Sequence, residues 1–184
     1  MRISCYRHIN AHTLLVFLML VVGCRQDVRE LSKVAESFKQ TQIIIPNSML
    51  KIQKGESVSY CVPRNLPIMI QYVGPKECSA CRVSHLGEYR KLFEVAEKTG
   101  LFEYMIIMSP SQQERKEIKD ILMNMWSKHP VYLDINGDFS SVNRIPADDR
   151  LHHFLIDTTH HPVFFGNPLS SEKLMSLFKE FLNL

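Results

Sequence analysis

A pair of cysteines between a buried strand and an amphipathic helix constrains this chain most. Residues Pro67 to Val73 form a nearly continuous apolar run of strand length, and Gly74-Pro75 marks its end. Cys78-Ser79-Ala80-Cys81 follows, and from Ser79 apolar residues recur at helical intervals until Gly100. The sequence therefore predicts a strand, a CxxC motif and one helix, in that order.

The alternation of strand and helix continues beyond Gly100. Tyr104 to Met108 reads as a second apolar strand, and Ser111 with Glu114 forms a capping-box signature before a helix whose apolar face runs from Ile118 to Trp126. The remaining predicted features are a strand at 131–134, a turn at 136–137, a polar stretch to 150, a hairpin of strands at 153–157 and 163–166, and a helix at 172–182. This order predicts an α/β domain with a central sheet.

The residues before this domain are weaker in pattern. Residues 27–39 have the apolar spacing of a short amphipathic helix, 42–45 and 49–53 look extended, and 55–65 reads as irregular. We therefore expect residues 24–64 to be a tether and N-terminal extension that partly packs on a domain at 65–184.

The first 23 residues have the layout of an export signal. Arg2 and Arg7 stand without any acidic residue, and Leu14 to Val22 is a run of nine apolar residues, too short to cross a membrane core that needs about 20. Val21-Val22-Gly23-Cys24 resembles the lipobox of bacterial lipoproteins. That resemblance implies an acylated Cys24 at the mature N-terminus and a soluble domain anchored to a membrane outside the cytoplasm, with the periplasmic side expected. The alternative is an ordinary signal peptide followed by an incidental cysteine.

Charge and cysteine content fit an exported domain. Lys and Arg number 22 and Asp and Glu 19, so without Arg2 and Arg7 the basic excess is one, too small for a nucleic-acid surface. Of five cysteines, Cys5 leaves with the leader and Cys24 takes the lipid. Cys61, Cys78 and Cys81 remain where disulfides persist, as a CxxC pair and one further cysteine.

The CxxC spacing predicts thiol-disulfide chemistry. A helix N-terminus favours an anion, so Cys78 is the candidate thiolate nucleophile, and Cys81, one turn later, is the candidate resolving cysteine. Lys76 and Arg82 would favour the thiolate, whereas Glu77 beside it would oppose it. The direction of electron flow stays open.

The strand at 67–73, the CxxC at a helix start, the strand at 104–108 and the terminal hairpin and helix together resemble the thioredoxin family, over about residues 66–184. Pro130 to Asp134 and the segments 154–157 and 163–168 resemble its membrane-tethered members in bacterial envelopes. The resemblance implies a thioredoxin-like fold with a central mixed sheet flanked by helices. It also implies thiol-disulfide oxidoreductase activity on protein substrates, a redox partner that resets the pair, and no organic cofactor. In one departure, the position of the cis-proline that this family places before its penultimate strand, facing the CxxC, falls at or near Leu151, and the nearest proline is Pro146.

Three other interpretations of the motif stay open. The pair could be a purely structural disulfide, or the domain could be a non-catalytic binding module on the same scaffold. Cys78, Cys81, His85 and one of His152 and His153 could instead bind zinc or copper. The adjacent histidines point to opposite faces if they lie on a strand, so only one could approach the sulfurs. Ordinary loop positions explain the remaining candidates, which are Asp148, Asp149, His160 and His161.

Overall fold

The computed structural model describes residues 27–62 and 65–183, so the leader and Cys24 lie outside the described residues. The chain falls into two compact units, one that ends at Glu36 and one that begins at Ser37. Residues 27–39 are helical, as their apolar spacing predicted. No helix within the described ranges has the length and hydropathy to span a membrane.

The second unit is built on one seven-stranded sheet with the order β2-β1-β5-β4-β3-β6-β7. Its central strands β3 (Ile68–Val73), β4 (Glu103–Met108) and β5 (Val131–Leu133) are parallel. β6 (His153–Ile156) and β7 (Pro162–Phe165) form an antiparallel hairpin on one side. The hairpin of β1 (Leu50–Gln53) and β2 (Glu56–Val58) extends the other side through antiparallel pairing of β1 with β5.

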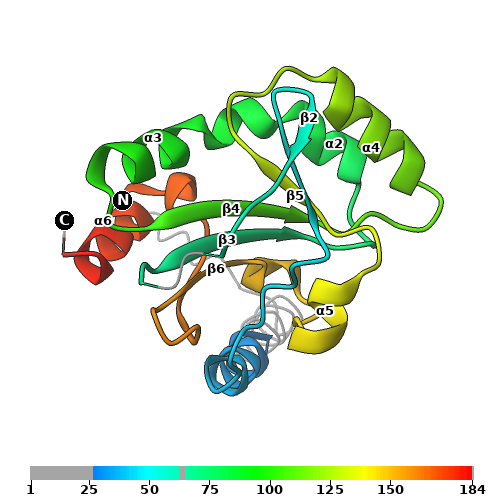
Figure 1. Cartoon of the computed structure of the whole chain (residues 1–184). Helices are drawn as coiled ribbons and strands as arrows, with labels where there is room; N and C mark the ends of the chain where they lie inside the picture. Colours follow the sequence, from blue (N-terminus) through cyan, green and yellow to red (C-terminus); the bar gives the residue numbers. More distant parts are fainter. Residues whose placement is uncertain (1–26, 63–64, 184) are drawn as a thin grey trace, which may run out of the picture. The chain divides into compact units, whose positions relative to one another are not determined.

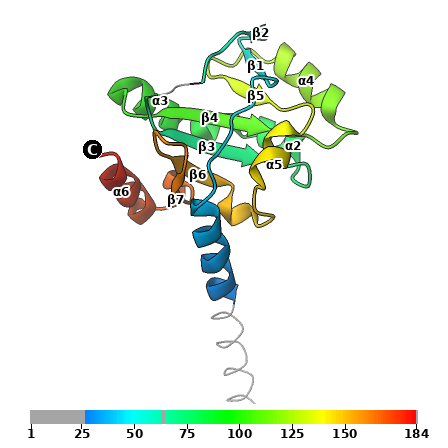
Figure 2. The same ribbon diagram turned by 60° about the horizontal axis from the view of Figure 1, so that its bottom comes forward.

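Helices cover both faces of this sheet (Figure 1). α2 (Ser79–Ser84), α3 (Arg90–Thr99) and α4 (Arg115–Asn124) lie along one face, and α5 (Asp138–Asn143) lies on the opposite face. α6 (Glu172–Phe181) follows β7, and Figure 2 shows it beside that hairpin. Three 3-10 helices complete the chain: η1 (Leu86–Tyr89), η2 (Asp149–Leu151) and η3 (Pro168–Ser170).

Two apolar cores lie on the two faces, because alternate residues of a strand point to opposite sides. Met69 and Val73 of β3 belong to the core that includes Leu92, Ile118 and Phe178 from helices. Ile68, Ile70 and Tyr72 belong to the second core, which includes Phe139 of α5 and Phe38. All six residues of β3 are therefore buried, which explains its continuous apolar sequence.

The expected fold class is confirmed: a mixed sheet flanked by helices, with a strand, the CxxC segment, a helix and a parallel strand, and then an antiparallel hairpin and a last helix. This is the thioredoxin-like arrangement. Gly100 ends α3 in the left-handed region at φ 63°, as its place after the helix predicted. Ser111 donates its hydroxyl to Glu114 at 2.6 Å at the start of α4.

Four local predictions were wrong. The single helix expected from Ser79 to Gly100 is divided into α2, η1 and α3, with the break at His85. Trp126 is 74% exposed because α4 ends before it and Met125 is extended. The polar stretch after Gly137 contains α5, and the segment expected to be irregular contains β2.

Candidate functional site

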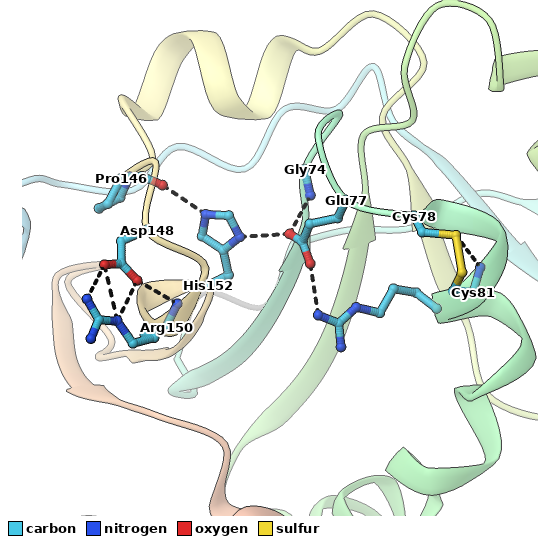
Figure 3. Close-up of polar contacts among 9 residues, drawn as sticks. Gly74, Glu77, Cys78, Cys81, Pro146, Asp148, Arg150 and His152 are labelled. Carbon is cyan, nitrogen blue, oxygen red and sulfur yellow. Dashed lines mark hydrogen bonds and ion pairs between the residues drawn. A yellow bond between two sulfur atoms is a disulfide. The ribbon is translucent and has the colours of Figure 1, made fainter.

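Cys78 and Cys81 form a disulfide at the start of α2 (Figure 3), with their Cα atoms 5.2 Å apart. β3 ends at Val73, and a turn in which Glu77 N–H donates to Gly74 O at 3.0 Å delivers Cys78 to the helix. Both cysteines are exposed. The sulfurs are thus paired and open to another molecule, as the thiol-exchange interpretation requires.

Cys78 is the N-cap residue of α2, and its Sγ accepts a hydrogen bond from the backbone N–H of Cys81 at 3.2 Å. The helix is only six residues long, so the contribution expected from a long helix dipole is smaller than the sequence suggested. The backbone N–H of Cys81 is instead the local donor that would favour a Cys78 thiolate in the reduced pair, because a hydrogen bond to a sulfur anion favours the anion. It distinguishes Cys78 from Cys81.

Glu77 does not act as a lone negative charge beside the sulfur. Its Oε1 accepts hydrogen bonds from Gly74 N–H at 3.0 Å and His152 Nδ1 at 2.8 Å, and its Oε2 accepts one from Arg82 at 3.0 Å. Burial alone would raise the pKa of Glu77, but the bonds from His152 and Gly74 and the charge of Arg82 outweigh it and lower that pKa. The opposition to a Cys78 thiolate expected from Glu77 is therefore largely offset by its cationic partners.

His152 connects this carboxylate to a second loop. Its Nδ1 faces Glu77, and its Nε2 donates to the carbonyl of Pro146 at 2.8 Å. The ring also packs edge-to-face on Tyr72, with centroids 5.1 Å apart. In Figure 3 the ring lies on the side of Glu77 away from the disulfide, so Glu77 stands between His152 and the cysteines.

His153, the first residue of β6, lies in a different environment. Its Nε2 is buried and has no hydrogen-bond partner, and its ring lies 6.1 Å from that of Tyr89. Burial, with the nearby charge of Arg82, lowers the pKa of His153 to about 4. The adjacent histidines therefore differ in charge: His152 is tied to a carboxylate, and His153 is a neutral, half-buried ring.

The four residues considered as a metal set are engaged elsewhere. The sulfurs of Cys78 and Cys81 are joined, His85 Nδ1 contacts Glu88 at 2.7 Å, and both nitrogens of His152 contact oxygens. Among residues 27–62 and 65–183, no three His, Cys, Asp or Glu residues group as a metal site would require. These contacts do not favour the zinc or copper alternative.

The position where the thioredoxin resemblance implies a proline is occupied by η2. Leu151 is its last residue and is buried, and His152 follows directly before β6. The described residues contain no cis peptide bond. Of these two residues, His152 contacts the segment next to the CxxC, through Glu77.

The remaining sequence candidates have ordinary structural contacts. Asp148 caps η2 and pairs with Arg150 at 2.6 Å. His160 faces the carbonyl of Ile43 at 3.2 Å and His161 faces the hydroxyl of Thr159 at 2.9 Å. Cys61 is free and exposed.

Sequence reasoning missed the role of Glu77 as a junction and missed a neighbouring cavity. The cavity has a volume of about 570 Å³ and lies between residues 74–77 and residues 145–150 with His152. Glu77 and His152 are 75 positions apart, so no local pattern joins them. The signal in the sequence was the thioredoxin resemblance, which places the segment before the penultimate strand, near Leu151, opposite the CxxC.

No protein-family model and no curated protein match the chain. Among solved structures, it is similar to an uncharacterized thioredoxin-like protein from Porphyromonas gingivalis, at 19% identity and TM-score 0.46, covering 79% of this chain and 94% of that one. It is similar to the thioredoxin domain of a thiol-disulfide oxidoreductase from Bacteroides vulgatus, at 16% identity and TM-score 0.49, covering 78% and 98%. It is also similar to an exposed lipoprotein thioredoxin from Streptococcus pneumoniae, at 13% identity and TM-score 0.47, covering 73% and 99%. These values are modest, and the strand order, the strand register and the place of the disulfide carry the assignment. By these three features the domain has a thioredoxin-like fold.

Proposed function

We propose that the protein is a thiol-disulfide oxidoreductase in which Cys78 attacks and Cys81 resolves. The observation that carries the proposal is an exposed disulfide whose first sulfur caps a helix directly after a buried central strand. A purely structural disulfide needs neither exposure nor a hydrogen-bond donor aimed at one sulfur.

In the reducing direction, the Cys78 thiolate attacks one sulfur of a substrate disulfide. A Cys78–substrate S–S bond forms, and the other substrate sulfur leaves as a thiolate, which takes up a proton. Cys81 loses its proton and attacks Cys78 Sγ, which forms the Cys78–Cys81 bond and releases the second substrate sulfur. The substrate gains two electrons and the dithiol loses two. The opposite direction runs these steps in reverse, and a second dithiol or disulfide protein resets the pair.

Insulin reduction with dithiothreitol as electron source tests the activity. Wild type should accelerate the reaction, Cys78→Ser should not, and Cys61→Ser is the matched control because Cys61 is also exposed but lies outside the pair. Thiol counting before and after reductant should show two additional free thiols in wild type and none in Cys78→Ser,Cys81→Ser. Equal insulin reduction by wild type and Cys78→Ser would overturn the proposal and favour a non-catalytic binding module.

The setting we propose is the bacterial cell envelope, with a lipid on Cys24 that anchors the soluble domain to a membrane. The leader and the lipobox-like residues 21–24 support it. Two or more acyl chains hold a protein stably, whereas one chain holds it weakly. Labelled palmitate should enter wild type and not Cys24→Ala, and Cys24→Ala should leave the membrane fraction. Equal labelling of both proteins would contradict the anchor.

A further inference from the structure

The contacts of His152 fix its protonation. Pro146 O can only accept a hydrogen bond, so the Nε2 atom 2.8 Å away carries a proton. Glu77 already accepts from Gly74 N–H and from the Arg82 guanidinium, which is the pattern of an ionised carboxylate. Nδ1, 2.8 Å from Glu77 Oε1, is then a donor as well. A ring that donates from both nitrogens is an imidazolium.

This ring bridges two segments that the sheet does not join directly. Glu77 precedes Cys78, and Glu77 also holds Gly74 and Arg82, so the segment from the end of β3 to α2 shares one carboxylate. Pro146 belongs to the loop between α5 and η2. The side chains of His152 and Glu77 are only 10% and 15% exposed, so water competes weakly for these bonds. Glu77, Pro146 and His152 also line the same cavity of about 570 Å³.

We propose that His152, with a proton on each ring nitrogen, is a positioning residue for thiol-disulfide exchange that fixes the Cys78 segment against the Pro146 loop. The proposal rests on the proposed function. His152 is on the far side of Glu77 from the disulfide in Figure 3, and it acts by holding the carboxylate and the cavity wall in place. Loss of either proton removes one of the two bonds.

The positioning is therefore pH-dependent. Burial would lower the pKa of His152, but the hydrogen bonds to Glu77 and Pro146 and the charge of Asp149 outweigh it and raise that pKa above 6.5. The bridge is complete below pH 6.5 and is lost as the pH rises through the raised pKa. At the acid end it is lost as the pH falls through the lowered pKa of Glu77. The titratable and charged groups around His152 and its partners are Tyr72 on β3, Glu77 before α2, Arg82 on α2, Asp148, Asp149 and Arg150 around η2, and His153 on β6.

Nuclear magnetic resonance on the full domain tests the protonation independently of activity. The His152 signals, assigned by their absence in His152→Gln, should show both nitrogens protonated at pH 6, with a pKa above 6.5. Glu77→Gln should lower this pKa and increase hydrogen exchange at the Gly74 amide. Glu88→Gln is the matched control, because Glu88, in η1, pairs with the exposed His85 at the C-terminal end of α2. A neutral His152 ring at pH 6 would overturn the proposal.

Insulin reduction over pH 6 to pH 9 tests the positioning role. At pH 6 the ratio of wild-type to His152→Gln kcat/KM should be about tenfold, less than the roughly hundredfold loss that a 1 Å misplacement of a reacting group can cause. The ratio should fall toward one as the pH rises, in step with the His152 titration, and Glu77→Gln should behave likewise. A ratio that is constant with pH, or equal to one throughout, would overturn positioning in an active enzyme. A wild type without exchange activity would instead overturn the proposed function, and with it the positioning role.

Discussion

At the residue scale, charge around the disulfide is organised by partners that are distant in sequence. Glu77 stands beside Cys78 in the chain, and its local effect on a thiolate is unfavourable. Its carboxylate receives hydrogen bonds from both His152 and Arg82, so the net field at the sulfur depends on the folded contacts. The sequence predicted the exposed pair and the first cysteine at a helix start. It could not predict this network, because only the pairing of β3 with β6 brings His152 near Glu77.

His153 should make the protein sensitive to acid. Its pKa is near 6.5 when unfolded and about 4 when folded, so the unfolded chain takes up a proton first as the pH falls. The shift corresponds to about 3 kcal/mol of stability that is present above pH 6.5 and lost by about pH 4. Urea unfolding at several pH values should show that His153→Gln reduces this loss, whereas His85→Gln, on an exposed ring, does not. Equal pH slopes for wild type and His153→Gln would contradict the assignment.

At the element scale, apolar periodicity located most elements but not their ends. β3, β4, β6, β7 and α6 follow their patterns within a few residues. The helix expected to run on to Gly100 breaks at His85. Val83 and Phe93, on either side of the break, are both buried, so the spacing of apolar residues gives no sign of the interruption. The apolar pattern did not predict α5, because Phe139 is the only large apolar residue of this helix that is buried. Such short elements are defined by tertiary contacts.

The turn between β1 and β2 gives a test at this scale. Gly55 has φ 77°, and a Cβ there would lie 2.7 Å from the carbonyl oxygen of Met123 at the end of α4. Gly100 has φ 63° but no atom within 4 Å of a Cβ. Gly100→Ala should lower the free energy of unfolding by about 1 kcal/mol, which is the penalty for a left-handed backbone conformation alone. Gly55→Ala should lower the free energy of unfolding by at least about 2 kcal/mol, because the clash with the Met123 carbonyl adds to the same backbone strain.

Urea unfolding of both glycine variants provides the measurement. If both variants lose the same free energy of unfolding, the turn between β1 and β2 is not in close contact with the end of α4. A smaller loss for Gly55→Ala than for Gly100→Ala would contradict the turn geometry itself.

At the scale of the whole molecule, residues from Ser37 onward are part of the folded unit. Phe38, Ile43, Ile45 and Met49 are buried in the core on the α5 face. Asn143 is fully buried, and its amide pairs with the backbone of Ile44 through two bonds of 2.7 Å. The part of this segment at 43–49 has only a weak pattern in the sequence, because no regular strand or helix carries its apolar residues.

Adjacent isoleucines in this segment should differ sharply in their effect on stability. Ile43 is 1% exposed and Ile44 is 57% exposed. Ile43→Ala should lower the free energy of unfolding by about 2 to 5 kcal/mol, the cost of a core cavity. Ile44→Ala should change it by less than about 0.5 kcal/mol, because its bonds to Asn143 use the backbone. Similar values for both would show that the segment does not pack as described.

Trapping of the mixed disulfide tests the central claim most directly, with Cys61→Ser in every protein to remove the third thiol. Reduced Cys81→Ala should form a lasting covalent adduct with insulin through Cys78, because no second thiol can release it. Reduced Cys78→Ala should form little or none, and the intact pair should release free insulin thiols and end as a disulfide. An adduct that forms through Cys81 in Cys78→Ala but is absent from Cys81→Ala would contradict the assignment of the two cysteines.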